Sequence, residues 1–317
     1  MSRPPSGREH VGVLVMAHGT PDTADGIEAF YTRIRRGRPP TAEQLADLQR
    51  RYRAIGGVSP LAARTRAQVD GLAARLEASA PGRYDVRFGA KHADPLIEEA
   101  AASFVGSGAD RVVGLVLTPH ASSMGSGEYL GRAAAALAAS PDAPPFSPVA
   151  QWYDASGFAE LQAGRLGDAL AGLPAGARAL VLFTAHSLPE RVVAEGDRYP
   201  DQLAESAAMV ARSAGLEAAQ VAWRVAWQSA GRTPEPWIGP DVLEVLRGAP
   251  DEGFTAAVVC PIGFVADHLE VLYDLDLEAR AVAESAGLAF ARTASLNDDP
   301  AFLDVLAAIV ASGAGGA

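Results

Sequence analysis

Two segments of this chain repeat one pattern, an apolar run rich in β-branched residues that ends in Ala-His and a small residue. Val11–Thr20 reads VGVLVMAHGT and Ala177–Leu188 reads ARALVLFTAHSL. Such runs are typical of buried strands in a parallel sheet, where ligands bind beyond the carboxyl ends of the strands. The repeat predicts two similar α/β domains that face one cleft, with His18 and His186 pointing into it from opposite sides.

Strand and helix patterns alternate along all 317 residues, a length typical of two domains. The expected strands, four in each half, are Val11–Ala17, Tyr84–Gly89, Arg111–Thr118, Ser147–Trp152, Ala179–Ala185, Val221–Trp227, Thr255–Ile262 and Leu288–Arg292. Amphipathic segments between them predict helices on both faces of two parallel sheets. We expect domains at 1–155 and 156–317, and leave open whether a terminal helix, 300–312, packs on the N-terminal domain.

Composition excludes several classes of function. The net charge of -11 argues against a nucleic-acid partner, because binding phosphates needs a positive field. No run reaches the roughly 18 apolar residues of a membrane span, and the first ten residues lack the apolar core of a signal peptide. We therefore expect a cytoplasmic protein that does not insert into membranes. Cys260, the single cysteine, is expected to be buried and cannot alone hold an iron–sulfur cluster.

The segment Asp267–Glu278, DHLEVLYDLDLE, concentrates acidic residues. On one α-helix, Glu270, Asp274 and Glu278 would lie four residues apart on one face, with Asp267 in the same arc. This spacing fits either a solvated acidic face or a ladder of oxygen ligands for divalent metal ions.

His186 follows the second repeated strand and is either structural or catalytic. The duplicated His18 and the neighbouring Glu270 favour catalysis, because an imidazole beside a carboxylate can take protons or bind a transition metal.

A third feature is basic. Phe30–Pro40, FYTRIRRGRPP, has four arginines within six positions. It is either a solvated turn or a site for a ligand with several carboxylates, which arginine binds bidentately. Arg50 and Arg51 precede a turn with paired glycines, Gly56 and Gly57, which lets the backbone approach a flat ligand closely.

Motifs spanning nearly the whole chain carry a resemblance to a known family. They are Met16–Pro21 (MAHGTP), Arg51-Tyr52, Ile55–Leu61 (IGGVSPL), Lys91-His92, Phe183–Pro189 (FTAHSLP), Pro261–Phe264 (PIGF) and Asp267–Asp274 (DHLEVLYD). In this order they resemble the ferrochelatase family, and within it the soluble bacterial branch that acts on coproporphyrin III. The resemblance implies two Rossmann-like domains in a chelatase-like arrangement. It also implies insertion of Fe(II) into coproporphyrin III to give coprohaem, with release of two protons, in haem biosynthesis.

By position, His186 and Glu270 match the catalytic pair of that family, which also binds the incoming metal. Asp274 and Glu278 match its outer acidic metal site, and His18 is a further candidate metal ligand. The residues that match contacts to the macrocycle or its carboxylates are His18, Ile34, Arg35, Arg36, Arg51, Ser59, His120, Ser122 and Ser123.

The resemblance also sets expectations for ligands and partners. Fe(II) and a tetrapyrrole are expected as substrates, without a permanently bound cofactor or an iron–sulfur cluster, and Mg²⁺ is a candidate occupant of the outer acidic site. Among proteins, enzymes that process coprohaem are the expected transient partners.

Two departures from the family pattern leave alternatives open. His18 stands where many members of the branch carry tyrosine, and Ala121 replaces a larger residue. The alternatives are a chelatase for cobalt, nickel, zinc or another tetrapyrrole, and a haem- or coprohaem-binding paralogue without turnover.

Overall fold

A computed structural model describes residues 9–231 and 233–315. Contacts divide the chain into two units. The first comprises the described residues up to Thr118, Ser123–Trp152 and the segment from Asn297 onward, and the second comprises Pro119–Ser122 and Tyr153–Leu296. The main chain thus crosses into the second unit after Trp152 and returns at Asn297, which places the terminal helix in the first unit.

The first unit is built on a parallel sheet with strand order β2-β1-β3-β4. Its strands are β1 (Val11–Ala17), β2 (Tyr84–Ala90), β3 (Arg111–Val116) and β4 (Phe146–Val149). Every residue of β1 is buried, because β1 lies between β2 and β3 and is covered on both faces. This explains why its sequence is apolar without alternation.

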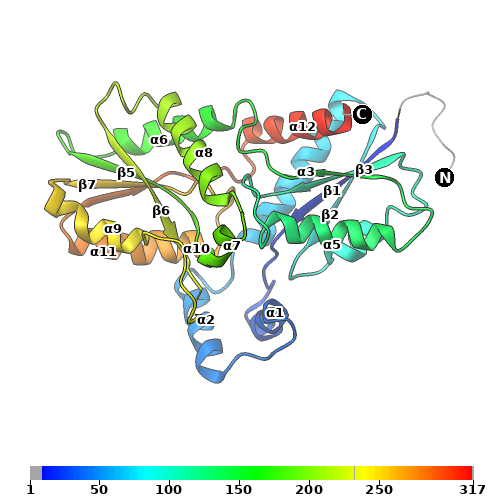
Figure 1. The fold of residues 1–317 in the computed structure, drawn as a ribbon, viewed down its shortest axis with the longest axis horizontal. Helices are drawn as coiled ribbons and strands as arrows, with labels where there is room; N and C mark the ends of the chain where they lie inside the picture. The colour runs from blue at the N-terminus through cyan, green and yellow to red at the C-terminus, as the bar shows by residue number, and fades with distance from the viewer. Residues whose placement is uncertain (1–8, 232, 316–317) are drawn as a thin grey trace. The chain divides into compact units, whose positions relative to one another are not determined.

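Helices cover the two faces of this sheet (Figure 1). Leu14 and Met16 of β1 pack with α4 (Ile97–Ala102) and α5 (Ser126–Ala138). Helices α3 (Leu61–Ser79) and α12 (Pro300–Gly315) pack on each other and on the sheet. Arg75 of α3 joins them, since it pairs with Asp304 and donates to the main-chain oxygen of Pro300.

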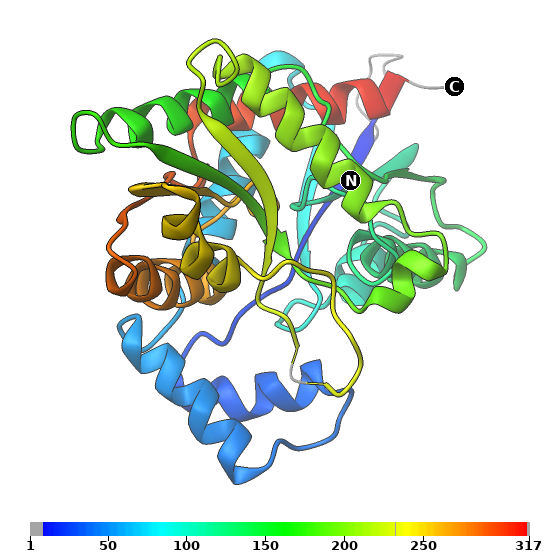
Figure 2. The same cartoon turned by 60° about the vertical axis from the view of Figure 1, so that its left-hand side comes forward.

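Two further helices of the first unit, α1 (Ile27–Ile34) and α2 (Ala42–Ala54), lie beside each other outside the sheet (Figure 2). A short 3₁₀ turn, Ala24–Gly26, precedes α1. Helix α2 begins at a capping box, in which the side chains of Thr41 and Gln44 each accept the other's main-chain N–H. The arginine-rich turn connects the two helices.

The second unit repeats the first sheet, with strand order β6-β5-β7-β8 and all pairs parallel. Its strands are β5 (Ala179–His186), β6 (Ala222–Gln228), β7 (Ala256–Cys260) and β8 (Ala289–Arg292). Each of the eight strands lies within three residues of its predicted bounds. The predicted fold class is confirmed: two four-stranded parallel sheets, each flanked by helices.

Alternate residues of β5 belong to two different hydrophobic clusters, each shared with a different pair of helices. Val181 and Phe183 pack with α6 (Phe158–Ala171) and α8 (Tyr199–Ser213). Leu180 and Leu182 pack with α9 (Val242–Gly248) and α11 (Arg280–Ser285). The remaining short elements are α7 (Glu190–Ala194), a 3₁₀ turn (Ala249–Glu252), α10 (Leu269–Leu272) and a π-helical turn (Asp274–Ala279).

The acidic segment is not the single α-helix that its spacing predicts. Helix α10 ends at Leu272, and the π-helical turn that follows has bonds between residues five apart, such as Glu278 N–H to the Tyr273 oxygen at 3.0 Å. The prediction that acidic side chains lie four residues apart along one α-helix is therefore wrong. Asp267 also leaves the proposed row, because it pairs with Arg292 at 3.4 Å and accepts a hydrogen bond from Ser295 at 2.7 Å.

Two further expectations from the sequence concern Cys260 and membrane-spanning segments. Cys260 lies fully buried at the end of β7, and burial raises the pKa of its thiol to about 12. Across the described ranges, no helix combines the length and apolar character needed to cross a membrane.

Candidate active site

His186 is the last residue of β5, at the carboxyl end of the central strand of the second sheet. Its Nδ1 contacts the main-chain oxygen of Ser187. Because a carbonyl oxygen only accepts hydrogen bonds, Nδ1 carries the proton of the neutral ring. Nε2 is then the basic nitrogen, and it lies 3.7 Å from Oε1 of Glu270.

Glu270 stands in the first turn of α10 between two imidazoles. Its Oε2 lies 3.5 Å from Nε2 of His268, whose Nδ1 contacts the main-chain oxygen of Ala266 at 2.9 Å. Burial opposes the charged form of His268, but the hydrogen bond to Glu270 and its negative charge outweigh burial and raise the pKa of His268. The side chain of Glu270 is 38% exposed, so the pair that it forms with His186 remains accessible to a ligand.

Two aromatic side chains, those of Tyr199 and Trp237, lie near His186. Tyr199, at the start of α8, donates its hydroxyl hydrogen to the main-chain oxygen of His186 at 3.2 Å. The Trp237 ring lies 6.4 Å from the His186 ring, and its indole N–H donates to Thr233 at 2.9 Å. These contacts orient the strand end that carries His186.

The outer acidic residues lie in the π-helical turn. Asp274 is buried and accepts a hydrogen bond from Ser229, which follows the end of β6. Glu278 is half-buried. No group of three or more histidine, cysteine, aspartate or glutamate side chains in the described part of the chain is arranged to hold a metal ion. Metal binding by Asp274 and Glu278 therefore stays a prediction.

His18 directly follows β1, in the other unit, and is exposed. Its ring lies 4.8 Å from that of His92 and 5.9 Å from that of Phe30. Burial, together with the charges of His18, Lys91, Arg132 and Arg33, lowers the pKa of His92 to about 3. His92 is thus neutral at physiological pH.

The arginine-rich turn presents guanidinium groups. Ile34 ends α1, and Arg35 stacks over Tyr31 at 5.7 Å from the ring centroid. The Nε–H groups of Arg35 and Arg38 each donate to the other residue's main-chain oxygen, at 3.2 and 3.4 Å. Among described residues, no carboxylate pairs with Arg35, Arg36 or Arg38, so these cations can receive the carboxylates of a ligand.

The other predicted substrate contacts are divided between the two units. Arg51 lies in α2 and pairs with Asp47 at 3.3 Å. Ser59 is buried and accepts the Leu61 N–H at 3.2 Å. Ser122 is buried in the second unit, whereas Ser123 is exposed in the first. Each substrate contact stays a prediction.

His120, also predicted to contact substrate, is 1% exposed. Its ring stacks on Tyr153 at 5.4 Å and meets Tyr199 edge-on at 6.2 Å. Neither ring nitrogen has a hydrogen-bond partner among the described residues. Burial lowers the pKa of His120 to about 3, so the ring is neutral.

Sequence reasoning missed three residues of this site: His268, Gln228 and Tyr199. Gln228 is the last residue of β6, as His186 is of β5, and the same rule about carboxyl ends of strands could have identified it. His268 stands two residues before Glu270. No local sequence pattern marked Tyr199, because its contact with His186 depends on how α8 packs.

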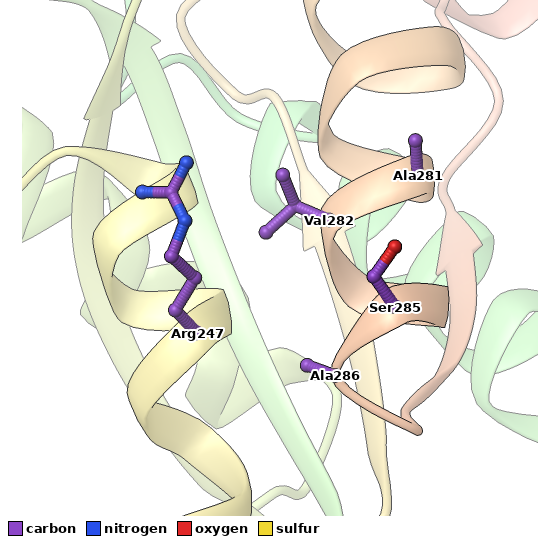
Figure 3. Close-up of a pocket in the computed structure, with 5 residues that line it drawn as sticks. All are labelled: Arg247, Ala281, Val282, Ser285 and Ala286. Carbon is purple, nitrogen blue, oxygen red and sulfur yellow. The ribbon is translucent and has the colours of Figure 1, made fainter.

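A pocket of the second unit lies between α9 and α11 (Figure 3). Arg247, Ala281, Val282, Ser285 and Ala286 line it. None of these is a predicted site residue, and neither His186 nor Glu270 lines this pocket.

Comparisons with known proteins show the family of the chain. A sequence model of the ferrochelatase family matches residues 10–314. A protein named coproporphyrin III ferrochelatase from Geobacillus kaustophilus is 43% identical over 307 residues, which cover 96% of each chain. A protein named ferrochelatase from Herpetosiphon aurantiacus is 43% identical over 300 residues, 94% of this chain and 97% of that one.

A solved structure of SirB from Bacillus subtilis with Fe³⁺ shares the fold, with a TM-score of 0.59 at 13% identity over 96% of each chain. The family match and the two relatives cover nearly all of the sequence. The chain belongs to the ferrochelatase family.

Proposed function

We propose that this protein inserts Fe(II) into coproporphyrin III to give coprohaem, with release of two protons, as a step in haem biosynthesis. The observation that carries the proposal is the approach of His186 Nε2 to Glu270 Oε1 at 3.7 Å at a strand end. The relatives' names supply the substrate, since several with about 42% identity are named coproporphyrin III ferrochelatases.

Metal insertion requires that two pyrrole N–H bonds break while metal–nitrogen bonds form. The basic Nε2 of His186 can accept a pyrrole proton, and Glu270 can accept the second or bind the incoming metal. The raised pKa of His268 favours its positive charge, 3.5 Å from Oε2 of Glu270. Proton acceptance and metal binding are therefore available within one group of side chains.

The outer acidic residues would supply metal. We infer that Asp274 and Glu278 attract divalent cations toward Glu270, and that Mg²⁺ can occupy their site. Carboxylate oxygens suit hard divalent cations. Iron enters as substrate, and the proposal includes neither a permanently bound cofactor nor an iron–sulfur cluster.

The arginine-rich turn would bind the carboxylates of the tetrapyrrole. Arg35 and Arg36 present guanidinium groups that no described carboxylate neutralises, and coproporphyrin III carries four propionates. We infer that Ile34, Arg51, Ser59, Ser122 and Ser123 complete the contacts, and that His18 ligates the metal. The remaining inferences are a cytoplasmic location, no partner nucleic acid, no membrane insertion, and transient contact with enzymes that process coprohaem.

The test is anaerobic addition of Fe(II) to purified protein with coproporphyrin III, followed by the Soret spectrum. Wild type is expected to form the iron porphyrin over many turnovers, while Glu270→Gln and His186→Ala lose most of the rate. Glu195→Gln, an exposed carboxylate after α7, is the matched control and should retain the rate.

Unchanged rates in both site variants would reject the assignment. If cobalt, nickel or zinc is inserted faster than iron, that metal is the substrate instead of iron. If the protein binds coprohaem tightly without turnover, it is a coprohaem carrier.

A further inference from the structure

Gln228 is a buried amide at the end of β6, the strand next to β5. It is 1% exposed and is paired in register with His186. Its main-chain oxygen accepts the N–H of Ser187, the residue after His186, at 2.8 Å. The backbone of Gln228 therefore holds the strand end that carries His186.

The side chain of Gln228 reaches the other member of the pair. Its Nε2 donates to the main-chain oxygen of Glu270 at 3.0 Å. A carbonyl oxygen cannot donate, so this contact fixes the orientation of the amide. Oε1 consequently faces Thr184, whose hydroxyl donates to it at 2.7 Å.

The second N–H of the amide points to Ser229 Oγ at 3.4 Å, and Ser229 in turn donates to Asp274. Both donors and the acceptor of the amide are thus in use. A buried amide with all its groups satisfied is rigid, and losing one partner leaves another polar group unpaired.

Glu270 lies in the first turn of a helical run that continues from α10 through the π-helical turn into α11. No side chain caps this first turn, and the first N–H groups of a helix have no partner within the helix. The bond from Gln228 joins the turn that carries Glu270 to the strand next to His186.

We propose that Gln228 is a positioning residue that holds Glu270 in register with His186, and that Thr184 orients its amide. The inference rests on the function proposed above. Gln228 is not proposed to contact substrate. It acts only through the placement of Glu270.

The experiment measures kcat and KM for coproporphyrin III, with Fe(II) saturating, in Gln228→Met and Gln162→Met. Both glutamines are buried in the second unit, at 1% and 3% exposure, and methionine keeps the chain length while removing the amide. Gln162 lies in α6 and is the matched control. We expect Gln228→Met to lose roughly tenfold or more of kcat with KM unchanged, and Gln162→Met to keep both.

Thr184 provides a second arm should Gln228→Met fail to fold. Thr184→Val removes the hydroxyl at nearly constant shape and is expected to lower kcat, whereas Thr184→Ser keeps the hydroxyl and is expected to restore it. A folded Gln228→Met with wild-type kcat would overturn the inference, as would equal losses in Gln162→Met or in the two Thr184 variants. Absence of metal insertion by wild type would instead reject the proposed function itself.

Discussion

Tyr199 donates its hydroxyl hydrogen to the main-chain oxygen of His186 across 3.2 Å. Burial, with smaller effects from the charges of Asp197 and Glu270, raises the pKa of Tyr199, so the phenol stays protonated and able to donate. The ring is wedged against Trp227 at 5.6 Å and His120 at 6.2 Å. A side chain of α8 thereby anchors the residue with which β5 ends.

Tyr199→Phe should keep this packing and remove only the donor. We expect a loss of about 1 kcal/mol in the free energy of unfolding, the usual contribution of one hydrogen bond. We also expect a lower kcat, because His186 loses a restraint. Urea unfolding and steady-state rates measure the two effects. Tyr153→Phe, which loses a bond to Glu205 instead, is the control; a similar kcat loss there would remove the special role of Tyr199.

Gly263→Ala should disturb the same strand end by crowding. A Cβ at residue 263 would lie 2.4 Å from the Cβ of Ala185 and 2.8 Å from its Cα, and Ala185 precedes His186. Since backbone must move, we expect a loss of about 1–3 kcal/mol in stability together with reduced kcat. Gly164→Ala, in α6 with open space around the new methyl group, should gain up to about 1 kcal/mol. Equal stability changes in the two variants would contradict this.

The strands could be predicted because burial on both faces leaves a direct mark in sequence. β1 and β5 lie between two neighbours and under helices on each side, so their residues are apolar without alternation. The same pattern placed His186 at the end of β5 and His18 directly after β1. Local pattern was therefore sufficient for the fold class and for these two positions in the fold.

The acidic segment shows where local pattern fails. Its four-residue spacing predicted one α-helix, but the structure has a π-helical turn from Asp274. Contacts with distant residues accompany this change: Asp267 and Asp276 pair with Arg292 of β8, and Asp274 bonds Ser229 after β6. No spacing rule within one segment reports partners that lie 16 to 45 residues away. The Thr184 and Gln228 contact was missed for the same reason.

Arg36 combines backbone strain with an exposed charge. Its φ of 56° is in the left-handed region, which costs a non-glycine residue roughly 1–2 kcal/mol. Arg36→Gly and Arg36→Ala both remove the guanidinium, but only glycine relieves the strain. We expect both to raise KM for coproporphyrin III, and the glycine variant to be about 1 kcal/mol more stable than the alanine variant.

Kinetics with a porphyrin that carries two carboxylates complete the Arg36 comparison. If Arg36 binds a propionate that this porphyrin lacks, KM for it should change less than KM for coproporphyrin III. An unchanged KM for coproporphyrin III in both variants would remove Arg36 from the binding site.

The buried ring of His120 should make the stability of the protein depend on pH. Burial lowers the pKa of its ring from 6.5 to about 3, so the folded state keeps His120 neutral where the unfolded state protonates it. Its contribution is fully present above pH 6.5 and is lost as the pH falls toward 3. Within that window the unfolded state binds one more proton than the folded state. The free energy of unfolding therefore falls by up to about 1.4 kcal/mol for each unit by which the pH falls.

His120→Phe should remove this cost while keeping the stacking on Tyr153. It also removes two buried nitrogens that have no partner in the described structure, so stability at pH 7 should change little or rise. Urea unfolding at pH 7, 5.5 and 4.5 measures this difference. At each lower pH, the free energy of unfolding of the variant should rise relative to that of wild type. Parallel curves for the two proteins would mean that His120 is protonated in the folded state or reaches solvent. In that case its nitrogens are available to a ligand, as the sequence resemblance implies, and the variant should raise KM for coproporphyrin III.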